Sequence, residues 1–170
     1  MDEKTKKQTR KRIAYGVMGY GRGHAMRTAS VLPELMQHYD VTLYCGGDAH
    51  DALSAQFEGQ LPIRRIPTIG YAYGSSGRIS VGNTLKKNFR PMSDVLLGGT
   101  GMKWLLKAFQ DERPDVVISD SEAWTHRAAM KLRIPRISFD HVGIIAYCLP
   151  PLPEDLWFKG HRDGWGYRML

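Results

Sequence analysis

One stretch near the start of the chain, residues 13–27 (IAYGVMGYGRGHAMR), restricts the possible folds more than any other. Residues 13–17 form a short apolar run typical of a buried strand, and a helical pattern begins at His24. The turn between them contains Gly19, Gly21 and Gly23. Because glycine adopts positive φ and leaves its amide unobstructed, we expect this turn to offer N–H donors and the positive end of a helix dipole to an anion or to sugar hydroxyls.

Two features separate this turn from a dinucleotide-binding fingerprint. In the pattern G-x-G-x-x-G the third glycine would fall at position 24, which here is histidine. The acidic residue expected at the end of the second strand is also displaced, since Asp48 follows Cys45 only after two glycines and is better placed to cap the next helix. An oxidoreductase that binds NAD or NADP is therefore kept as an alternative and not as the first interpretation.

His24 is the first candidate for chemistry. An imidazole at the mouth of a glycine turn is suited to proton transfer or to hydrogen bonding a polar ligand. Arg27 lies three residues later, on the same side of the first helical turn, and we expect it to approach the same ligand. The alternatives are a histidine that only hydrogen-bonds its neighbours and an ordinary surface arginine.

Apolar strands alternate with helical stretches along the chain. Strand-like runs cover residues 13–17, 41–45, 63–66, 116–118 and 136–139. Helical patterns cover residues 24–37, 48–57 and 89–110, and a further helix ends at 132. This alternation is typical of a parallel sheet covered on both faces, so we expect a single α/β domain of the Rossmann-like, three-layer α/β/α type with a mostly parallel sheet.

Three places along the chain are expected to interrupt regular structure. Pro33 predicts a kink or an early break in the first helix. Residues 68–84 are rich in glycine and serine and predict a long loop, in which Tyr71 and Tyr73 form either a binding surface or a mobile excursion. Residues 98–101 (GGTG) are a weak point in the long helix and lack the spacing of a phosphate loop.

Polar side chains follow two later strands. Residues 119–122 (SDSE) come at the end of one strand, and Asp140 and His141 at the end of the next. Because ligands of open α/β sheets bind outside the carboxyl ends of the strands, we expect these groups to face the same crevice as the glycine turn. Ser121 is a candidate helix cap, and the dipole of that helix would favour Asp120 and Glu122 there even without a functional role.

Three segments resemble GT-B glycosyltransferases: YGVMGYGRGHAMR at 15–27, ISDSE at 118–122 and ISFDH at 137–141. The first is similar to the first loop of the branch around the peptidoglycan N-acetylglucosaminyltransferase and its archaeal and bacterial homologues, which carry G-x-G-H-x-x-R. The likeness covers most of residues 13–145 and implies the N-terminal, acceptor-binding half of a GT-B fold. It further implies an inverting, metal-independent transferase that needs no cofactor and uses a nucleotide sugar as cosubstrate.

The resemblance also implies roles for individual residues. His24 would be the base that takes the acceptor proton, or a group that orients the acceptor. Asp120 would accept the proton directly or hold the imidazole in its useful tautomer. The groups implied to contact substrate are Gly21, Gly23, Arg27, Glu122 and His141.

Composition places the chain among soluble globular domains, with 42% hydrophobic and 24% charged residues and a net charge of +7. We expect a flexible basic arm at 1–12, the Rossmann-like domain at 13–149 and an aromatic tail or interdomain segment at 150–170. No signal sequence is apparent and the two cysteines suit a reducing compartment, so we expect a cytoplasmic protein. The basic arm leaves peripheral membrane contact open, and no nucleic-acid partner is expected.

Only the acceptor half of such an enzyme is recognisable in the sequence. No second series of alternating strands and helices follows residue 153, and no donor-nucleotide motif is present. We expect part of a longer enzyme, inactive alone, with a sugar or a lipid-linked molecule as acceptor and a donor-binding domain in cis or in trans. The alternatives are a non-catalytic acceptor- or lipid-binding subunit of a two-chain transferase and a degenerate binding domain.

Overall fold

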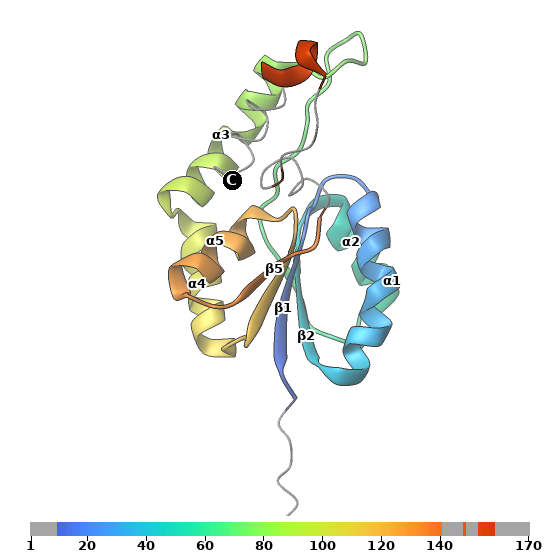
Figure 1. The fold of residues 1–170 in the computed structure, drawn as a ribbon, viewed down its shortest axis with the longest axis vertical. Coiled ribbons are helices and arrows are strands. Elements are labelled where there is room, and N and C mark those ends of the chain that lie inside the picture. Colours follow the sequence, from blue (N-terminus) through green and yellow to red (C-terminus); the bar gives the residue numbers. More distant parts are fainter. Residues whose placement is uncertain (1–9, 141–147, 149–152, 159–170) are drawn as a thin grey trace, which may run out of the picture.

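The structure, a computed structural model that describes residues 10–140, 148 and 153–158, contains one parallel sheet (Figure 1). Its five described strands are β1 (Arg12–Val17), β2 (Asp40–Cys45), β3 (Ile63–Arg65), β4 (Val116–Asp120) and β5 (Arg136–Ser138). They lie in the order β3-β2-β1-β4-β5, and every pairing is parallel. The expected α/β, Rossmann-like fold is therefore confirmed.

Helices cover both faces of the sheet (Figure 1). One layer consists of α1 (Gly23–His38) and α2 (Gly47–Phe57), and the other contains α4 (Thr100–Glu112) and α5 (Ala123–Leu132). A further helix, α3 (Val81–Leu97), packs against α4 and α5 at one end and extends beyond the carboxyl-terminal edge of the sheet. The remaining described element is the short 3-10 helix η1 (Glu154–Leu156).

The central strand β1 is buried on both faces, which its apolar sequence requires. Ile13, Tyr15 and Val17 pack into the core beneath α1 and α2, whereas Ala14 belongs to the core beneath α4 and α5. Gly16 faces α5 so closely that a Cβ atom there would lie 2.0 Å from Thr125 Oγ1. The absence of a side chain at position 16 therefore allows α5 to approach the sheet.

The first helix continues through Pro33. An early break at Pro33 is wrong, because α1 runs to His38 with Pro33 inside it. Proline removes one helical hydrogen bond, but Leu32 and Ala29 on the same helix are buried against the sheet. Most helix stability in proteins comes from such packing, which here maintains the helix across the proline.

The expected helix over 89–110 is two helices. The first of them, α3, begins at Val81, where the Ser80 side chain accepts a hydrogen bond from Asn83 N, so the preceding loop is shorter than expected. It ends at Gly98 in the left-handed conformation (φ 79°), which bears out the predicted weak point. The Asp94 carboxylate then accepts hydrogen bonds from the backbone N–H groups of Gly101 and Met102 and so fills the N-terminus of α4.

Arg10 and Lys11, at the end of the expected basic arm, contact the domain. The Arg10 guanidinium donates to the carbonyl oxygens of Met36 and Tyr39, and the Lys11 ammonium donates to Asp115 at 3.1 Å. Residues 1–9 and most of the apolar element expected at 143–149 lie outside the described residues. No helix of the described part combines the length and the apolar character needed to cross a membrane.

The close approach at Gly16 generates a stability prediction. Gly16→Ala should lower the free energy of unfolding by about 1–3 kcal/mol, because the new methyl group must displace the buried Thr125 side chain. Gly82→Ala is the matched control, since a Cβ atom there meets nothing within 4 Å and alanine favours the helix by up to about 1 kcal/mol. Urea unfolding followed by circular dichroism measures both; equal stability of the two variants would contradict the packing argument.

Candidate functional site

Three polar segments meet at the carboxyl-terminal edge of the sheet. They are the turn after β1, the end of β4 and the end of β5, and the strands that carry them are consecutive neighbours in the sheet. From β1 the chain adds β2 and β3 on one side of the sheet and then β4 and β5 on the other, so the direction of strand addition switches between β1 and β4. In open α/β sheets a crevice opens at such a switch point. The expected convergence of these strand ends on one edge is therefore present.

The glycine turn after β1 is held by the protein itself. Gly21 adopts φ 75°, and its N–H donates to the Asp48 carboxylate at 3.0 Å. The expectation that Asp48 caps α2 is wrong, since Gly46 is the N-cap and no side chain caps that helix. Gly19 approaches Gly46 and Thr68 so closely that a Cβ atom would lie 2.3 Å from Thr68 Oγ1. The turn is thus fixed before any ligand arrives, and the Gly21 amide is already used.

Gly23 differs from the other glycines of the turn. It is the first residue of α1, and a Cβ atom built on it would meet nothing within 4 Å. No side chain caps the helix, whose N-cap residue is Arg22. The unobstructed backbone at Gly23 is therefore consistent with its expected place next to a ligand.

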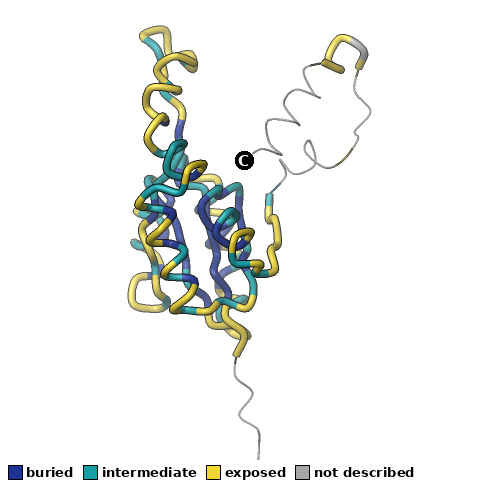
Figure 2. The backbone as a smooth tube through the Cα atoms, turned by 90° about the vertical axis from the view of Figure 1, so that its left-hand side faces the viewer, coloured by how far each residue is buried: buried dark blue, intermediate teal, exposed yellow. Residues whose placement is uncertain are grey.

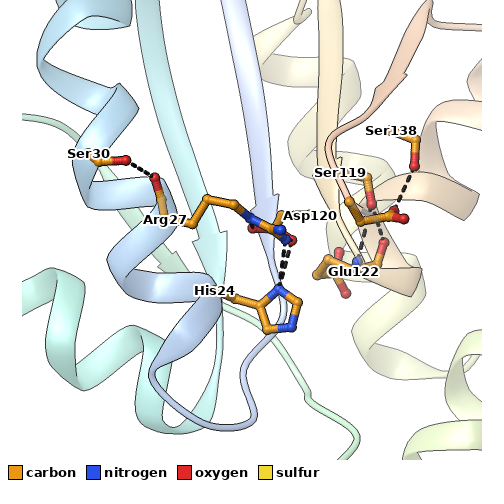
Figure 3. A network of polar contacts seen from close by, with 8 residues as sticks. His24, Arg27, Ser30, Ser119, Asp120, Glu122 and Ser138 are labelled. Atoms are coloured by element: carbon orange, nitrogen blue, oxygen red, sulfur yellow. Dashed lines mark hydrogen bonds and ion pairs between the residues drawn. The ribbon is translucent and has the colours of Figure 1, made fainter. Parts of the chain in front are cut away.

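His24 and Asp120 form a direct pair across the edge of the sheet (Figure 3). His24 Nδ1 lies 2.7 Å from Asp120 Oδ1, although the residues are 96 positions apart in the sequence. The Asp120 side chain has 0% exposure and that of His24 has 24%. The buried acid therefore holds a partly exposed imidazole at the carboxyl-terminal edge of the sheet.

The pairing determines which imidazole nitrogen is available. A carboxylate only accepts hydrogen bonds, so Nδ1 carries the proton and Nε2 keeps its lone pair in the neutral ring. Nε2 lies on the side of the ring away from Asp120 (Figure 3), and no described residue hydrogen-bonds it. This arrangement suits a base whose tautomer is fixed by an acid.

Arg27 is the second partner of the buried acid. Its Nε donates to Asp120 Oδ2 at 3.1 Å and its Nη2 donates to Oδ1, so the guanidinium binds the carboxylate through two nitrogens. The Arg27 guanidinium also lies over the Phe139 ring, with Cζ 5.4 Å from the ring centroid. The hydrogen bonds to Asp120 raise the pKa of Arg27 above its usual value. Arg27 therefore stays charged and compensates the buried negative charge.

Glu122 has a structural position beside this site. It is the N-cap of α5, and its carboxylate accepts hydrogen bonds from Trp124 N at 2.9 Å, Thr125 N at 2.7 Å and Thr125 Oγ1 at 2.6 Å. The expectation that Ser121 caps this helix is wrong, because Ser121 has φ 53° and precedes the cap. The capping contacts explain the position of Glu122, in agreement with the structural interpretation of the sequence. An acceptor contact is not needed to explain this position.

The end of β5 contributes a further acid. Ser138 Oγ donates to the Asp140 carboxylate at 2.7 Å. His141, expected to contact the acceptor, lies outside the described residues. Within the described ranges, no group of three or more His, Cys, Asp or Glu residues is arranged to hold a metal ion.

A cavity of about 510 Å³ lies at the opposite edge of the sheet. Residues at or just before the starts of four strands line it, among them Arg12, Asp40, Pro62 and Pro114. It therefore lies away from the His24–Asp120 pair and forms no part of the candidate site.

The chain is similar to proteins of known family and structure. Residues 11–160 match the family described as glycosyl transferase family 1. A search of curated proteins found no match. Among solved structures, Arabidopsis thaliana UGT89C1 complexed with UDP shares 16% identity with a TM-score of 0.51, over 84% of this chain and 40% of that one.

Two bacterial structures are also similar. SsfS6, a Streptomyces sp. SF2575 glycosyltransferase, shares 17% identity with a TM-score of 0.50, over 92% of this chain and 44% of that one. MurG of Acinetobacter baumannii shares 16% identity with a TM-score of 0.46, over 75% of this chain and 33% of that one. The chain thus spans less than half the length of each of these proteins. The family match and the two chains with TM-scores of 0.50 and 0.51 confirm the fold of a GT-B N-terminal domain. The closer branch within GT-B stays a prediction.

The buried Glu122 generates a pH prediction. Burial raises the pKa of Glu122 to about 7, although the hydrogen bonds from Thr125 and Trp124 act in the opposite direction. Between the usual pKa near 4.5 and about 7, the folded protein holds a proton that the unfolded chain has lost. The stabilisation that comes from protonated Glu122 is therefore fully present below pH 4.5. The free energy of unfolding then falls by up to about 3 kcal/mol as the pH rises through 7.

Glu122→Gln should remove that part of the pH dependence, because glutamine does not titrate. Denaturant unfolding of both proteins between pH 4.5 and 8 gives the difference, and Glu58→Gln, which alters an exposed acid, serves as the control. An unchanged slope in Glu122→Gln would show that Glu122 is ionised throughout this range.

Proposed function

Since the chain belongs to glycosyl transferase family 1, we propose that it is the acceptor-binding domain of an enzyme that transfers a sugar from a nucleotide sugar to an acceptor hydroxyl. The observation that carries this proposal is the 2.7 Å contact between His24 Nδ1 and the buried Asp120 carboxylate at the switch point of the sheet. Transfer to a hydroxyl needs a base at the acceptor, and this pair provides one on the N-terminal domain.

The chemistry assigned to His24 is proton removal. Nε2 takes the proton of the acceptor hydroxyl while its oxygen forms a bond to the anomeric carbon of the donor sugar. The bond between that carbon and the nucleotide diphosphate breaks, and the diphosphate leaves with the electron pair. Asp120 holds Nδ1–H in place and stabilises the imidazolium that results.

Arg27 is better described as a positioning residue than as a substrate contact. Two of its nitrogens bind the carboxylate that in turn orients His24. A buried carboxylate is unfavourable unless it is paired, and Arg27 supplies that pairing through two nitrogens. The direct contact with the acceptor that the family resemblance implies for Arg27 is therefore replaced in this proposal by an indirect role.

Gly23 is assigned to the substrate through its backbone. Its N–H belongs to the first turn of a helix that no side chain caps, and the space beside it is open. Such N–H groups favour an anion or a hydroxyl oxygen. For Gly21 we propose a conformational role only, because its N–H is bonded to Asp48.

The donor would be bound by a second domain. The similar solved chains are more than twice as long as the part that this chain covers, and one of them holds UDP. We infer that a donor-binding domain in the same polypeptide or in a partner completes the site. A uridine diphosphate sugar is the first donor to test, and a sugar or a lipid-linked molecule is the acceptor class.

The base assignment predicts a kinetic loss. In the protein assembled with its donor-binding domain, His24→Ala and Asp120→Asn should each lower transfer by about 10²–10⁴-fold, the usual contribution of a positioned base. His38→Ala is the matched control, because His38 lies on the same helix and is exposed at its far end. Release of UDP from a panel of UDP sugars, with free and lipid-linked sugars as acceptors, measures the effect.

The outcome that would overturn this assignment is unchanged transfer in both variants. In that case the chain would fit the alternative of a non-catalytic acceptor- or lipid-binding subunit. If a variant loses both transfer and the circular dichroism spectrum of the folded protein, His24→Gln tests the assignment instead. Glutamine keeps a polar side chain of similar length.

If the donor site lies on a second domain, the 170-residue chain by itself should not bind the donor. We expect calorimetry to detect no saturable binding of UDP-glucose or UDP-N-acetylglucosamine, because the donor site lies on the other domain. The same chain should release no UDP from either sugar. Micromolar binding of a UDP sugar to this chain would contradict the acceptor-domain proposal.

A further inference from the structure

Phe139, the first residue after β5, has no part in the proton transfer assigned to His24. Its backbone N–H donates to the carbonyl oxygen of Ser119 at 2.9 Å, so it is fixed beside the residue that precedes Asp120. Its side chain is only partly covered, with 36% exposure. An aromatic ring therefore lies at the carboxyl-terminal edge of the sheet, next to the strand that carries the buried acid.

The Phe139 ring contacts the guanidinium of Arg27. Arg27 Cζ lies 5.4 Å from the centroid of the ring, a distance at which the negative face of an aromatic ring attracts a cation. The Arg27 side chain is 30% exposed, and partial removal from water strengthens this attraction. The same guanidinium donates from two nitrogens to Asp120. It is thus held by a carboxylate from β4 and by an aromatic ring that follows β5.

Tyr15 holds the Phe139 ring in place from below. The centroids of the two rings are 6.4 Å apart and the rings are nearly perpendicular, at 81°, which is a favourable geometry for an aromatic pair. Tyr15 is 1% exposed and belongs to the buried backbone that runs through the centre of the domain (Figure 2). Burial raises the pKa of Tyr15 to about 12, so this support stays uncharged.

A second acid makes the position of the guanidinium important. The hydrogen bonds to Asp120 raise the pKa of Arg27 most, burial acts in the opposite direction, and the charge of Asp140 adds a smaller increase. Two acids on neighbouring strands therefore attract the same guanidinium. Arginine has a long side chain with many rotamers, and an aromatic face beside it restricts that freedom. The ring favours the position in which both nitrogens reach Asp120.

We propose that Phe139 is a positioning residue of the transferase site, which holds the Arg27 guanidinium on Asp120 and through that carboxylate orients His24. The inference rests on the proposed function, in which His24 is the base. Since Phe139 acts through Arg27, its loss lowers the rate of transfer and leaves substrate binding almost unchanged. A small displacement of a catalytic group is sufficient for such an effect.

Nuclear magnetic resonance of the 170-residue chain tests the contact without any substrate. The probe is the Nε–H group of Arg27, which donates to Asp120 Oδ2 at 3.1 Å. Phe139→Leu keeps an apolar side chain but removes the aromatic face. It should speed the exchange of this proton with water by about fivefold or more, because exchange requires the contact to open. Phe139→Tyr keeps the face and should leave the exchange rate unchanged.

Kinetics of the protein assembled with its donor-binding domain tests the consequence for transfer. Phe139→Leu should lower kcat by about 5–30-fold, the factor that corresponds to a cation–π contact at a partly buried site, with little change in KM for the acceptor. Phe139→Tyr should restore kcat. Ile137→Ala is the matched control, because it shortens a 51% exposed apolar side chain two residues earlier and should change neither constant.

A double-mutant cycle tests whether Phe139 acts through Arg27. In an Arg27→Gln background the guanidinium is absent, so Phe139→Leu should cause no further loss of kcat. Urea unfolding of each variant shows whether a loss comes from unfolding instead. If Arg27→Gln does not fold, the exchange of the Arg27 Nε–H proton in Phe139→Leu decides the question.

Three outcomes would overturn the proposal. They are an unchanged Arg27 exchange rate in Phe139→Leu, an equal loss of kcat in Phe139→Leu and Phe139→Tyr, and a full effect of Phe139→Leu in the Arg27→Gln background. A failure of the transferase proposal is distinguishable from these results. In that case His24→Ala leaves transfer unchanged, whereas the response of the Arg27 proton to Phe139→Leu persists.

Discussion

The buried carboxylate of Asp120 is the interaction on which the candidate site depends. It is fully enclosed and is compensated by Arg27 through two nitrogens and by the imidazole of His24. An unpaired carboxylate in this position would be strongly unfavourable, so β4 and the start of α1 have to lie together. The order of the sheet, with β1 between β2 and β4, brings the first turn of α1 to that position.

Supporting contacts keep the surrounding backbone in place without using the reactive groups. The Asp48 carboxylate binds the Gly21 amide, and the Glu122 carboxylate binds the first turn of α5. Gly16 allows that helix to lie close to the central strand. Acidic residues thus hold two turns at this edge of the sheet, which leaves His24 Nε2 pointing away from Asp120 (Figure 3).

Much of this arrangement could be predicted from the sequence, because it follows from local patterns and one topological rule. Apolar strands that alternate with helices predict a parallel sheet, and parallel strands place the groups after residues 17 and 118 on one edge. The rest depends on tertiary contacts that no local pattern contains. Ser121 is the residue type that usually caps a helix, but it has a left-handed φ and Glu122 takes the N-cap position instead. Likewise, the Gly21–Asp48 bond joins residues 27 positions apart, and the hydrogen bond from Gly70 N to Asn88, which ties α3 to the preceding loop, joins residues 18 positions apart.

The sharing of one acid by Arg27 and His24 has a consequence for divergence among related chains. Arg27 Nη2 lies 3.2 Å from His24 Nδ1, a separation that two donors tolerate only because the same carboxylate oxygen accepts from both. A descendant that lost the acid would lose both the carboxylate that fixes the His24 tautomer and the carboxylate that pairs with the Arg27 guanidinium. Positions 24, 27 and 120 are therefore expected to be inherited as a set and replaced as a set.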